Sequence, residues 1–229
     1  MATATIISVL NVLSGAVAFL ISYYAYKNNR LVGSVLLRYI SMGFLLLGFG
    51  LFLQAATERI VSVTAIEAAR VRDLSLVAFL VYTAIQLLAY SIFAWGYGLT
   101  FFSRPPAKDT EGAAATALPA LVMAATNPIT RKILEGIVVV LAIYLASQAA
   151  IVVLLLLIVF HGVRVFSQTK SNLSLMVLFG FVLIFVAHVL ILLAGLTLGA
   201  TLNLIGNTVE FCGFVSLLFF LYWSGRVVR

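Results

Sequence analysis

Long apolar runs occupy most of the chain and limit what it can fold into. Six of them reach the roughly 20 residues that a helix needs to cross the hydrocarbon core of a bilayer. These runs cover residues 4–26, 31–56, 74–102, 133–160, 173–198 and 204–223. Only 9% of the residues are charged, whereas a soluble domain is roughly a quarter charged. The sequence therefore predicts an all-α polytopic membrane protein.

A shorter apolar segment, residues 112–126, is rich in alanine and has Pro119 in its middle. Its central part, about 14 residues long, would rise only about 21 Å as a helix, less than the roughly 30 Å hydrocarbon core. The pair Asn127-Pro128 matches an N-cap followed by proline at the first helical position, so a new helix is expected to begin there. Length alone leaves six or seven spans open.

Basic residues are distributed unevenly between the ends of the runs. Lysine or arginine follows the runs that end near residues 26, 102, 160 and 223, and aromatic residues gather at the same four ends. The basic side of a membrane protein is cytoplasmic. All four ends can lie on the same side of the membrane only if the chain crosses it an odd number of times. We therefore expect a seven-helix bundle in the cell membrane, with the N-terminus outside and the C-terminus cytoplasmic.

Two basic residues oppose this topology, because Arg131 and Lys132 would then lie outside. The alternative is a bundle of six spans in which residues 112–126 do not cross. That alternative would put the basic residues after residues 160 and 223 outside and leave an inner loop without charge. The charge pattern favours seven spans.

One helical hairpin sequence occurs twice in the chain. Residues 20–47 align with residues 157–184 at a constant offset and without a gap. The most specific matches are Ser34 with Ser171, Gly43 with Gly180, and Lys27 with Arg164.

This match predicts an internal repeat of three helices. The expected organisation is 3+1+3, with a first repeat in residues 1–104, a linker or short fourth span in residues 105–130, and a second repeat in residues 131–229. Seven spans make the repeats parallel and six make them inverted, and transporters are built in both ways.

A 3+1+3 arrangement resembles, in architecture alone, the sugar-conducting and PQ-loop transporters, and more loosely the rhodopsins. The chain contains no Pro-Gln pair, and residues 204–223 contain no lysine on which a retinal Schiff base could form. The resemblance therefore implies an arrangement of helices and no family.

Two ionisable residues lie inside predicted spans, where such groups are costly and are functional candidates by default. His188 and Glu210 each lie eleven residues from Gly199, the centre of the turn between their spans. A helical hairpin therefore sets both at a similar depth, roughly 15 Å from the turn. A carboxylate beside an imidazole favours the charged pair and burial favours neutral forms, and in either case the pair could hold or pass a proton.

Four amide side chains extend this polar set. Asn203 and Asn207 precede the glutamate at helical spacing on one face, and Gln86 and Gln148 lie at mid-membrane depth in two other spans. The structural alternative is that these groups only hydrogen-bond across helices, which contributes about 0.6–2 kcal/mol for each contact. The sequence leaves a pathway and a structural role both open.

An enzyme is not expected, and no catalytic residue is predicted. The apolar runs contain no aspartate and no paired carboxylates, and the chain has no glycine-rich phosphate loop. Cys212 is the only cysteine, so an intrachain disulfide is impossible, and neither a metal site nor a cofactor is predicted. The net charge of +7 does not indicate nucleic acid, because basic residues at the ends of spans orient the protein and meet anionic lipid.

Two classes of function remain. One is a small-solute or proton-coupled transporter or channel, whose site lies between the repeats and uses the six polar residues named above. The other is a non-catalytic membrane subunit or sensor within a larger complex. The expected partners are the lipid bilayer and either further copies of the chain or other membrane subunits.

Overall fold

A computed structural model describes residues 2–63, 68–102, 128–170, 172–197 and 199–227, and side chains in residues 5–57, 77–98, 141–168, 170, 174–197 and 199–224. The described helices are α1 (Ala2–Val32), α2 (Val35–Val63), α3 (Ala68–Phe102), α4 (Pro128–Thr169), α5 (Asn172–Thr197) and α6 (Ala200–Val227). Each contains a stretch of 22 to 28 residues that is long and apolar enough to cross a membrane. The prediction of an all-α polytopic membrane protein is confirmed.

The described helices number six, which agrees with the six-span alternative. The segment predicted as a seventh span, residues 112–126, lies outside the described residues. Helix α4 begins at Pro128, as the proline after Asn127 predicts, because proline suits the first helical position, where no helical hydrogen bond is lost.

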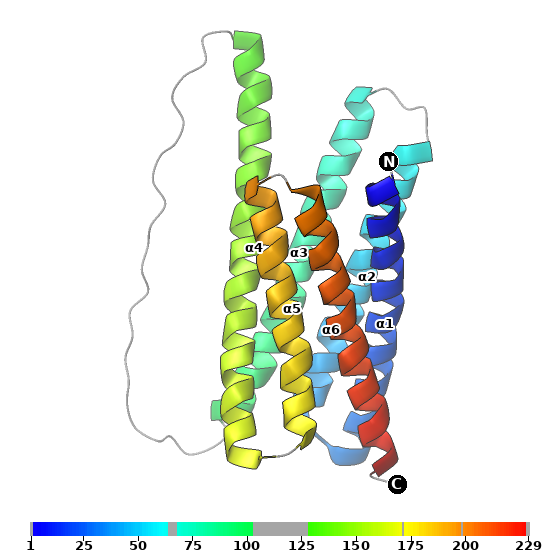
Figure 1. The fold of residues 1–229 in the computed structure, drawn as a ribbon, viewed down its shortest axis with the longest axis vertical. Coiled ribbons are helices and arrows are strands. Elements are labelled where there is room, and N and C mark those ends of the chain that lie inside the picture. Colours follow the sequence, from blue (N-terminus) through cyan, green and yellow to red (C-terminus); the bar gives the residue numbers. More distant parts are fainter. Residues whose placement is uncertain (1, 64–67, 103–127, 171, 198, 228–229) are drawn as a thin grey trace, which may run out of the picture.

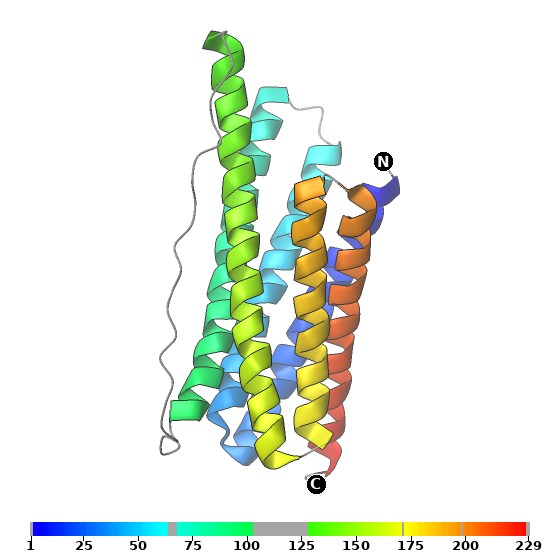
Figure 2. The same ribbon diagram turned by 60° about the vertical axis from the view of Figure 1, so that its left-hand side comes forward.

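The helices stand side by side in a closed ring (Figures 1 and 2). Each packs against the helix before and after it in the order of the six, and α6 closes the ring by packing against α1. Figure 1 shows that α1, α3, α4 and α6 run in one direction and that α2 and α5 run in the other. Because α3 and α4 are parallel, the end of α3 and the start of α4 lie at opposite ends of the bundle.

The α1–α2 and α4–α5 hairpins turn in the same way at aligned positions. Gly33 and Lys170 have positive φ angles of 65° and 48°, and they fall on one another at the offset of the predicted repeat. The Gly33 N–H donates to the carbonyl of Asn29, and the Lys170 N–H to the carbonyl of Phe166, both at 2.7 Å. We call the end with these two turns the turn end, and the end where α1 begins the N-terminal end.

Glycines on α5 and α6 let their backbones approach closely, because a glycine has no Cβ to hold a neighbour away. A Cβ at Gly206 would lie 2.7 Å from Cγ1 of Ile191 and 3.1 Å from the carbonyl oxygen of Ala187. A Cβ at Gly213 would lie 3.1 Å from the carbonyl oxygen of Gly180. The α5–α6 hairpin therefore packs backbone against backbone.

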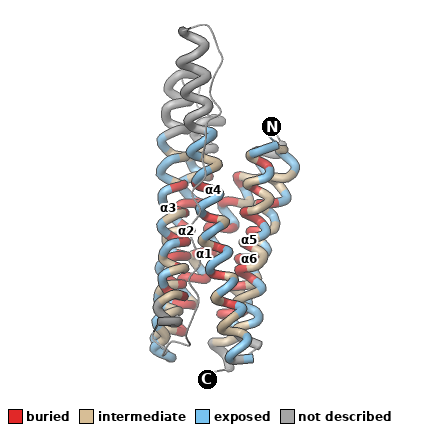
Figure 3. Tube along the Cα trace, turned by 90° about the vertical axis from the view of Figure 1, so that its left-hand side faces the viewer, coloured by how far each residue is buried: buried red, intermediate tan, exposed pale blue. Residues whose placement is uncertain are grey.

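Buried residues follow the inner faces of the helices, and exposed residues follow the outer faces (Figure 3). The outer faces carry large apolar side chains, such as Phe49, Trp95 and Phe160. A soluble protein rarely exposes so much continuous apolar surface. The apolar outer faces are suited to a lipid environment.

Candidate functional site

Four buried polar residues from four helices meet in the core, with His188 of α5 at their centre. Its Nε2 lies 2.8 Å from the hydroxyl oxygen of Tyr90 on α3 and 3.6 Å from Oε1 of Glu210 on α6. Its Nδ1 lies 3.2 Å from Oε1 of Gln148 on α4. All four residues are at most 4% exposed. We call these four residues the His188 cluster.

The close α5–α6 packing positions the acidic member of the cluster. Glu210 lies between Gly206 and Gly213 on the face of α6 that meets α5, at helical spacing from both. The length of the hairpin in the sequence predicts equal depth for His188 and Glu210, and the structure brings these two side chains together.

The hydrogen bonds of His188 allow two protonation states. In neutral imidazole one ring nitrogen donates and the other accepts. Donation from Nδ1 to Gln148 leaves Nε2 to accept from the Tyr90 hydroxyl. In a protonated ring Nε2 must donate, and it lies within ion-pair distance of the Glu210 carboxylate.

Oε1 of Glu210 has no hydrogen-bond partner among the described residues. It is therefore free to receive a hydrogen bond when the His188 ring is protonated. A buried charge is strongly destabilising unless it is paired, and the Glu210 carboxylate supplies that pairing. The cluster can hold a proton in the membrane interior without leaving an isolated charge.

Gln86 extends this polar region along α3, one turn before Tyr90. It is 2% exposed, and its Nε2 donates to the hydroxyl oxygen of Tyr82 at 2.6 Å. Its Oε1 has no hydrogen-bond partner among the described residues, and neither does Oγ1 of Thr83. The part of α3 on the N-terminal side of the cluster therefore carries buried polar atoms that lack partners.

The two asparagines of α6 form the predicted stripe. Nδ2 of Asn207 donates to the backbone carbonyl of Asn203 at 2.7 Å and lies 3.1 Å from its Oδ1. Both residues are partly buried. They lie on α6 between Glu210 and the N-terminal end of the bundle, so the polar face continues from the cluster towards that end.

Tyr90 is the cluster residue that sequence reasoning missed, because it lies inside its apolar run, away from the aromatic residues at the ends of the spans. A usable signal was its position four residues after Gln86, deep within the apolar run. A buried tyrosine hydroxyl usually has a hydrogen-bond partner, so a mid-span tyrosine beside a polar residue indicates an interior contact.

Other buried polar residues fit the structural alternative. The hydroxyl of Ser22 donates to the carbonyl of Ser41 at 2.8 Å, and the hydroxyl of Ser41 donates to the carbonyl of Ser22 at 2.9 Å. Nδ2 of Asn28 donates to the carbonyl of Leu221 at 2.9 Å. These bonds link α1 to α2 and α6, and none of these three side chains has a buried polar atom without a hydrogen-bond partner. They act as contacts between helices.

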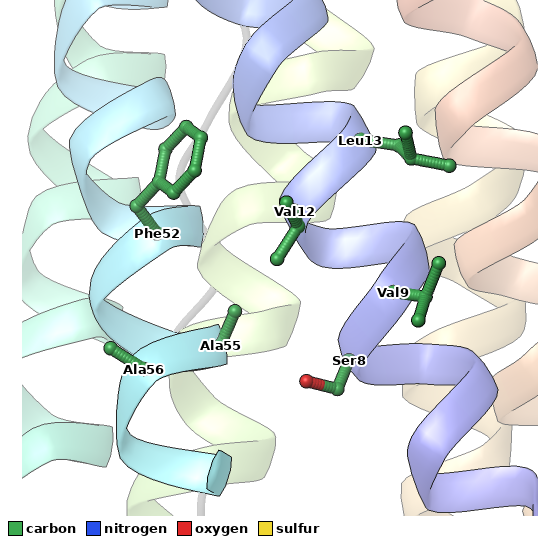
Figure 4. A pocket seen from close by; sticks show the side chains of 7 residues that line it. All are labelled: Ser8, Val9, Val12, Leu13, Phe52, Ala55 and Ala56. Carbon is green, nitrogen blue, oxygen red and sulfur yellow. The ribbon is translucent and has the colours of Figure 1, made fainter.

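A separate pocket of about 320 Å³ lies between α1 and α2. Figure 4 shows its lining side chains, which are Ser8, Val9, Val12, Leu13, Phe52, Ala55 and Ala56. Apart from one serine these side chains are apolar, and none belongs to the His188 cluster. The pocket is suited to apolar material and is not part of the polar site.

Among the residues that the structure describes, no group of three or more His, Cys, Asp or Glu residues is arranged to hold a metal ion. No protein-family model matches the chain, and no curated protein or solved structure matches it. The feature of the chain that points to a function is therefore the geometry of the His188 cluster.

Proposed function

We propose that this protein is a proton-coupled transporter or channel-like bundle for a small solute, with its proton site in the His188 cluster. The observation that carries the proposal is that Nε2 of His188 lies between the Tyr90 hydroxyl and a Glu210 oxygen that has no hydrogen-bond partner among the described residues. Ionisable residues inside membrane bundles mark ion pathways and proton relays.

The distribution of the cluster residues over the two proposed repeats also supports transport. Tyr90 belongs to the proposed first repeat, whereas Gln148, His188 and Glu210 belong to the second. Transporter sites lie near the bilayer midplane at the interface between repeats. The aligned turns and the closed ring support parallel repeats. A two-fold axis along the bundle would exchange α1 with α4, α2 with α5 and α3 with α6. The α3–α4 contact would then correspond to the α1–α6 contact, and both contacts are present.

We also propose seven crossings. The parallel directions of α3 and α4 support this number, because the end of α3 and the start of α4 then lie on opposite sides of the membrane if both helices span it. A cytoplasmic turn end is supported by its basic residues, which are Lys27, Arg30, Arg38, Arg164 and Lys170. This orientation places the N-terminus outside.

Labelling of single cysteines tests the topology. In a Cys212→Ser background, Lys108→Cys and Lys132→Cys are treated in intact cells with a membrane-impermeant thiol reagent. We expect only position 132 to react, because positions 108 and 132 then lie on opposite sides. Equal behaviour of the two positions would refute the odd number of crossings.

Proton flux tests the site. Purified protein is reconstituted into liposomes that contain a pH-sensitive dye, and neutral sugars, amino acids and carboxylates are added singly to the outside. We expect one class of solute to change the internal pH. The variants His188→Ala and Glu210→Gln should abolish this change while remaining monodisperse. Full flux in both variants would refute the proposal.

The second candidate is a non-catalytic subunit or sensor. It is favoured by the apolar outer faces and by the apolar α1–α2 pocket, which lies apart from the polar cluster. In that case the two variants should lower only thermal stability, and the chain purified in mild detergent should retain other membrane proteins. Native mass spectrometry of that preparation separates the two candidates.

A further inference from the structure

Four phenylalanines fill the core directly beside the His188 cluster. They are Phe44 on α2, Phe93 on α3, Phe181 on α5 and Phe214 on α6, and each is at most 1% exposed. Ring centroids lie 4.9 Å apart for Phe44 and Phe93, 5.6 Å for Phe44 and Phe214, and 5.8 Å for Phe93 and Phe181. We call these four residues the aromatic layer.

The aromatic layer lies between the cluster and the turn end. Phe214 follows Glu210 by about one turn on α6, and Phe93 follows Tyr90 by about one turn on α3; both helices run towards the turn end. On α5, which runs the other way, the phenylalanine precedes the histidine by about two turns. The rings of Tyr90 and Phe93 are 5.9 Å apart, so the layer packs against the cluster.

The opposite side of the cluster is polar. Gln86 and Thr83 precede Tyr90 by one and two turns on α3, and each has a buried oxygen without a hydrogen-bond partner among the described residues. Asn11, near the start of α1, has a buried Nδ2 that also lacks a hydrogen-bond partner among the described residues. Nearly all buried polar groups in folded proteins are hydrogen-bonded, often to ordered water. Ordered water would satisfy these donors and acceptors.

We propose that water reaches the His188 cluster from the N-terminal end of the bundle, along Gln86 and Thr83, and that the aromatic layer closes the route to the turn end. The inference that this asymmetry serves transport rests on the proposed function. A transporter must close its site on one side while the other side is open. A proton arriving through this water is taken up by His188 or Glu210 and is held there, because no polar group of the aromatic layer can accept it.

Phe93 is the layer residue to remove, because its ring contacts Phe44 and Phe181 and packs against Tyr90. The variant Phe93→Ala opens a space beside polar groups, and water enters cavities that are roomy and polar. Phe219→Ala is the matched control, since this ring on α6 is 57% exposed on the outer surface. Phe93→Ala/Glu210→Gln tests whether a leak passes through the cluster.

The assay measures proton leak into dye-loaded liposomes under a potassium diffusion potential, with no solute added. We expect Phe93→Ala to leak several-fold faster than wild type and Phe219→Ala, and the double variant to return to the wild-type rate. The proposal is overturned if Phe93→Ala leaks no faster than Phe219→Ala. It is also overturned if the double variant leaks as fast as the single variant.

A second measurement does not depend on the folding of Phe93→Ala. In the Cys212→Ser background, Thr83→Cys should react with a charged, water-soluble thiol reagent. Leu217→Cys, one turn beyond Phe214, should not react, although both positions are at most 5% exposed. An unreactive Thr83→Cys would overturn the water route.

The two proposals can fail separately. If Phe93→Ala leaks through Glu210 but no solute drives proton flux in wild type, the aromatic layer stands and transport fails. If solute-driven flux depends on His188 but Phe93→Ala does not leak, transport stands and the aromatic layer is not a barrier.

Discussion

Gly206 is the point at which the packing of α6 against α5 can be tested beside the polar site. A Cβ at this position would lie 2.7 Å from Cγ1 of Ile191, 3.1 Å from the carbonyl oxygen of Ala187 and 3.3 Å from the Ile191 nitrogen. Carbon atoms in contact lie about 3.5–4.0 Å apart. Rotation of the Ile191 side chain can relieve only the first of these contacts, because the other two atoms belong to the α5 backbone, and Gly206→Ala must therefore push α6 away by a few tenths of an ångström.

This displacement has two consequences. Overpacking a core costs about 1–3 kcal/mol, and alanine regains about 1 kcal/mol over glycine in a helix, so we expect a net loss of up to about 2 kcal/mol in stability. Glu210 lies one turn further along the same face of α6. The same shift moves its carboxylate away from His188 Nε2, now 3.6 Å away, and solute-driven proton flux should fall.

The matched control is Gly98→Ala on α3, where an added Cβ meets nothing within 4 Å. Both variants are heated in detergent, and the fraction that remains monodisperse is measured by size-exclusion chromatography. Gly206→Ala should lose its folded fraction at a lower temperature than wild type, and Gly98→Ala at the same or a higher one. If the two variants behave alike, α5 and α6 are not in the close contact on which the site geometry depends.

Two further predictions concern individual hydrogen bonds. Tyr90→Phe leaves the buried Nε2 of His188 without its hydroxyl partner, which should cost about 1–3 kcal/mol and lower the thermal midpoint in detergent; an unchanged midpoint would contradict the Tyr90–His188 bond. Ser22→Ala and Ser41→Ala, measured singly and together, should show a coupling energy of about 0.6–1.7 kcal/mol, as expected for hydrogen bonds between membrane helices. Purely additive effects would show that this pair does not link α1 to α2.

The pairing of His188 with Glu210 could be predicted because it lies within one helical hairpin. Only the rise per residue and the position of the Gly199 turn are needed to set the two side chains at equal depth. The start of α4 at Pro128 was predictable for the same reason, since capping depends on adjacent residues. Gln86 and Gln148 were recognised as interior polar groups from their depth alone.

The partners of these residues could not be predicted. Tyr90 and Gln148 reach His188 from α3 and α4, and hydropathy does not reveal which helices adjoin or which face each turns inward. The aromatic layer was missed for the same reason, because phenylalanine suits a lipid-facing surface and a packed core equally well. A mean-hydropathy profile cannot distinguish Phe49 on the outside from Phe44 in the core.

The sequence by itself determined that the chain is helical and membrane-embedded, that one hairpin sequence recurs, and that a buried acid and imidazole share a depth. Each of these follows from the order of residues along one helix or one turn. The tertiary structure decided that α6 closes the ring against α1, that α3 and α4 are parallel, and that the cluster has an aromatic side and a polar side. These features depend on how six apolar helices pack against one another, and the sequence of a single helix does not determine that packing.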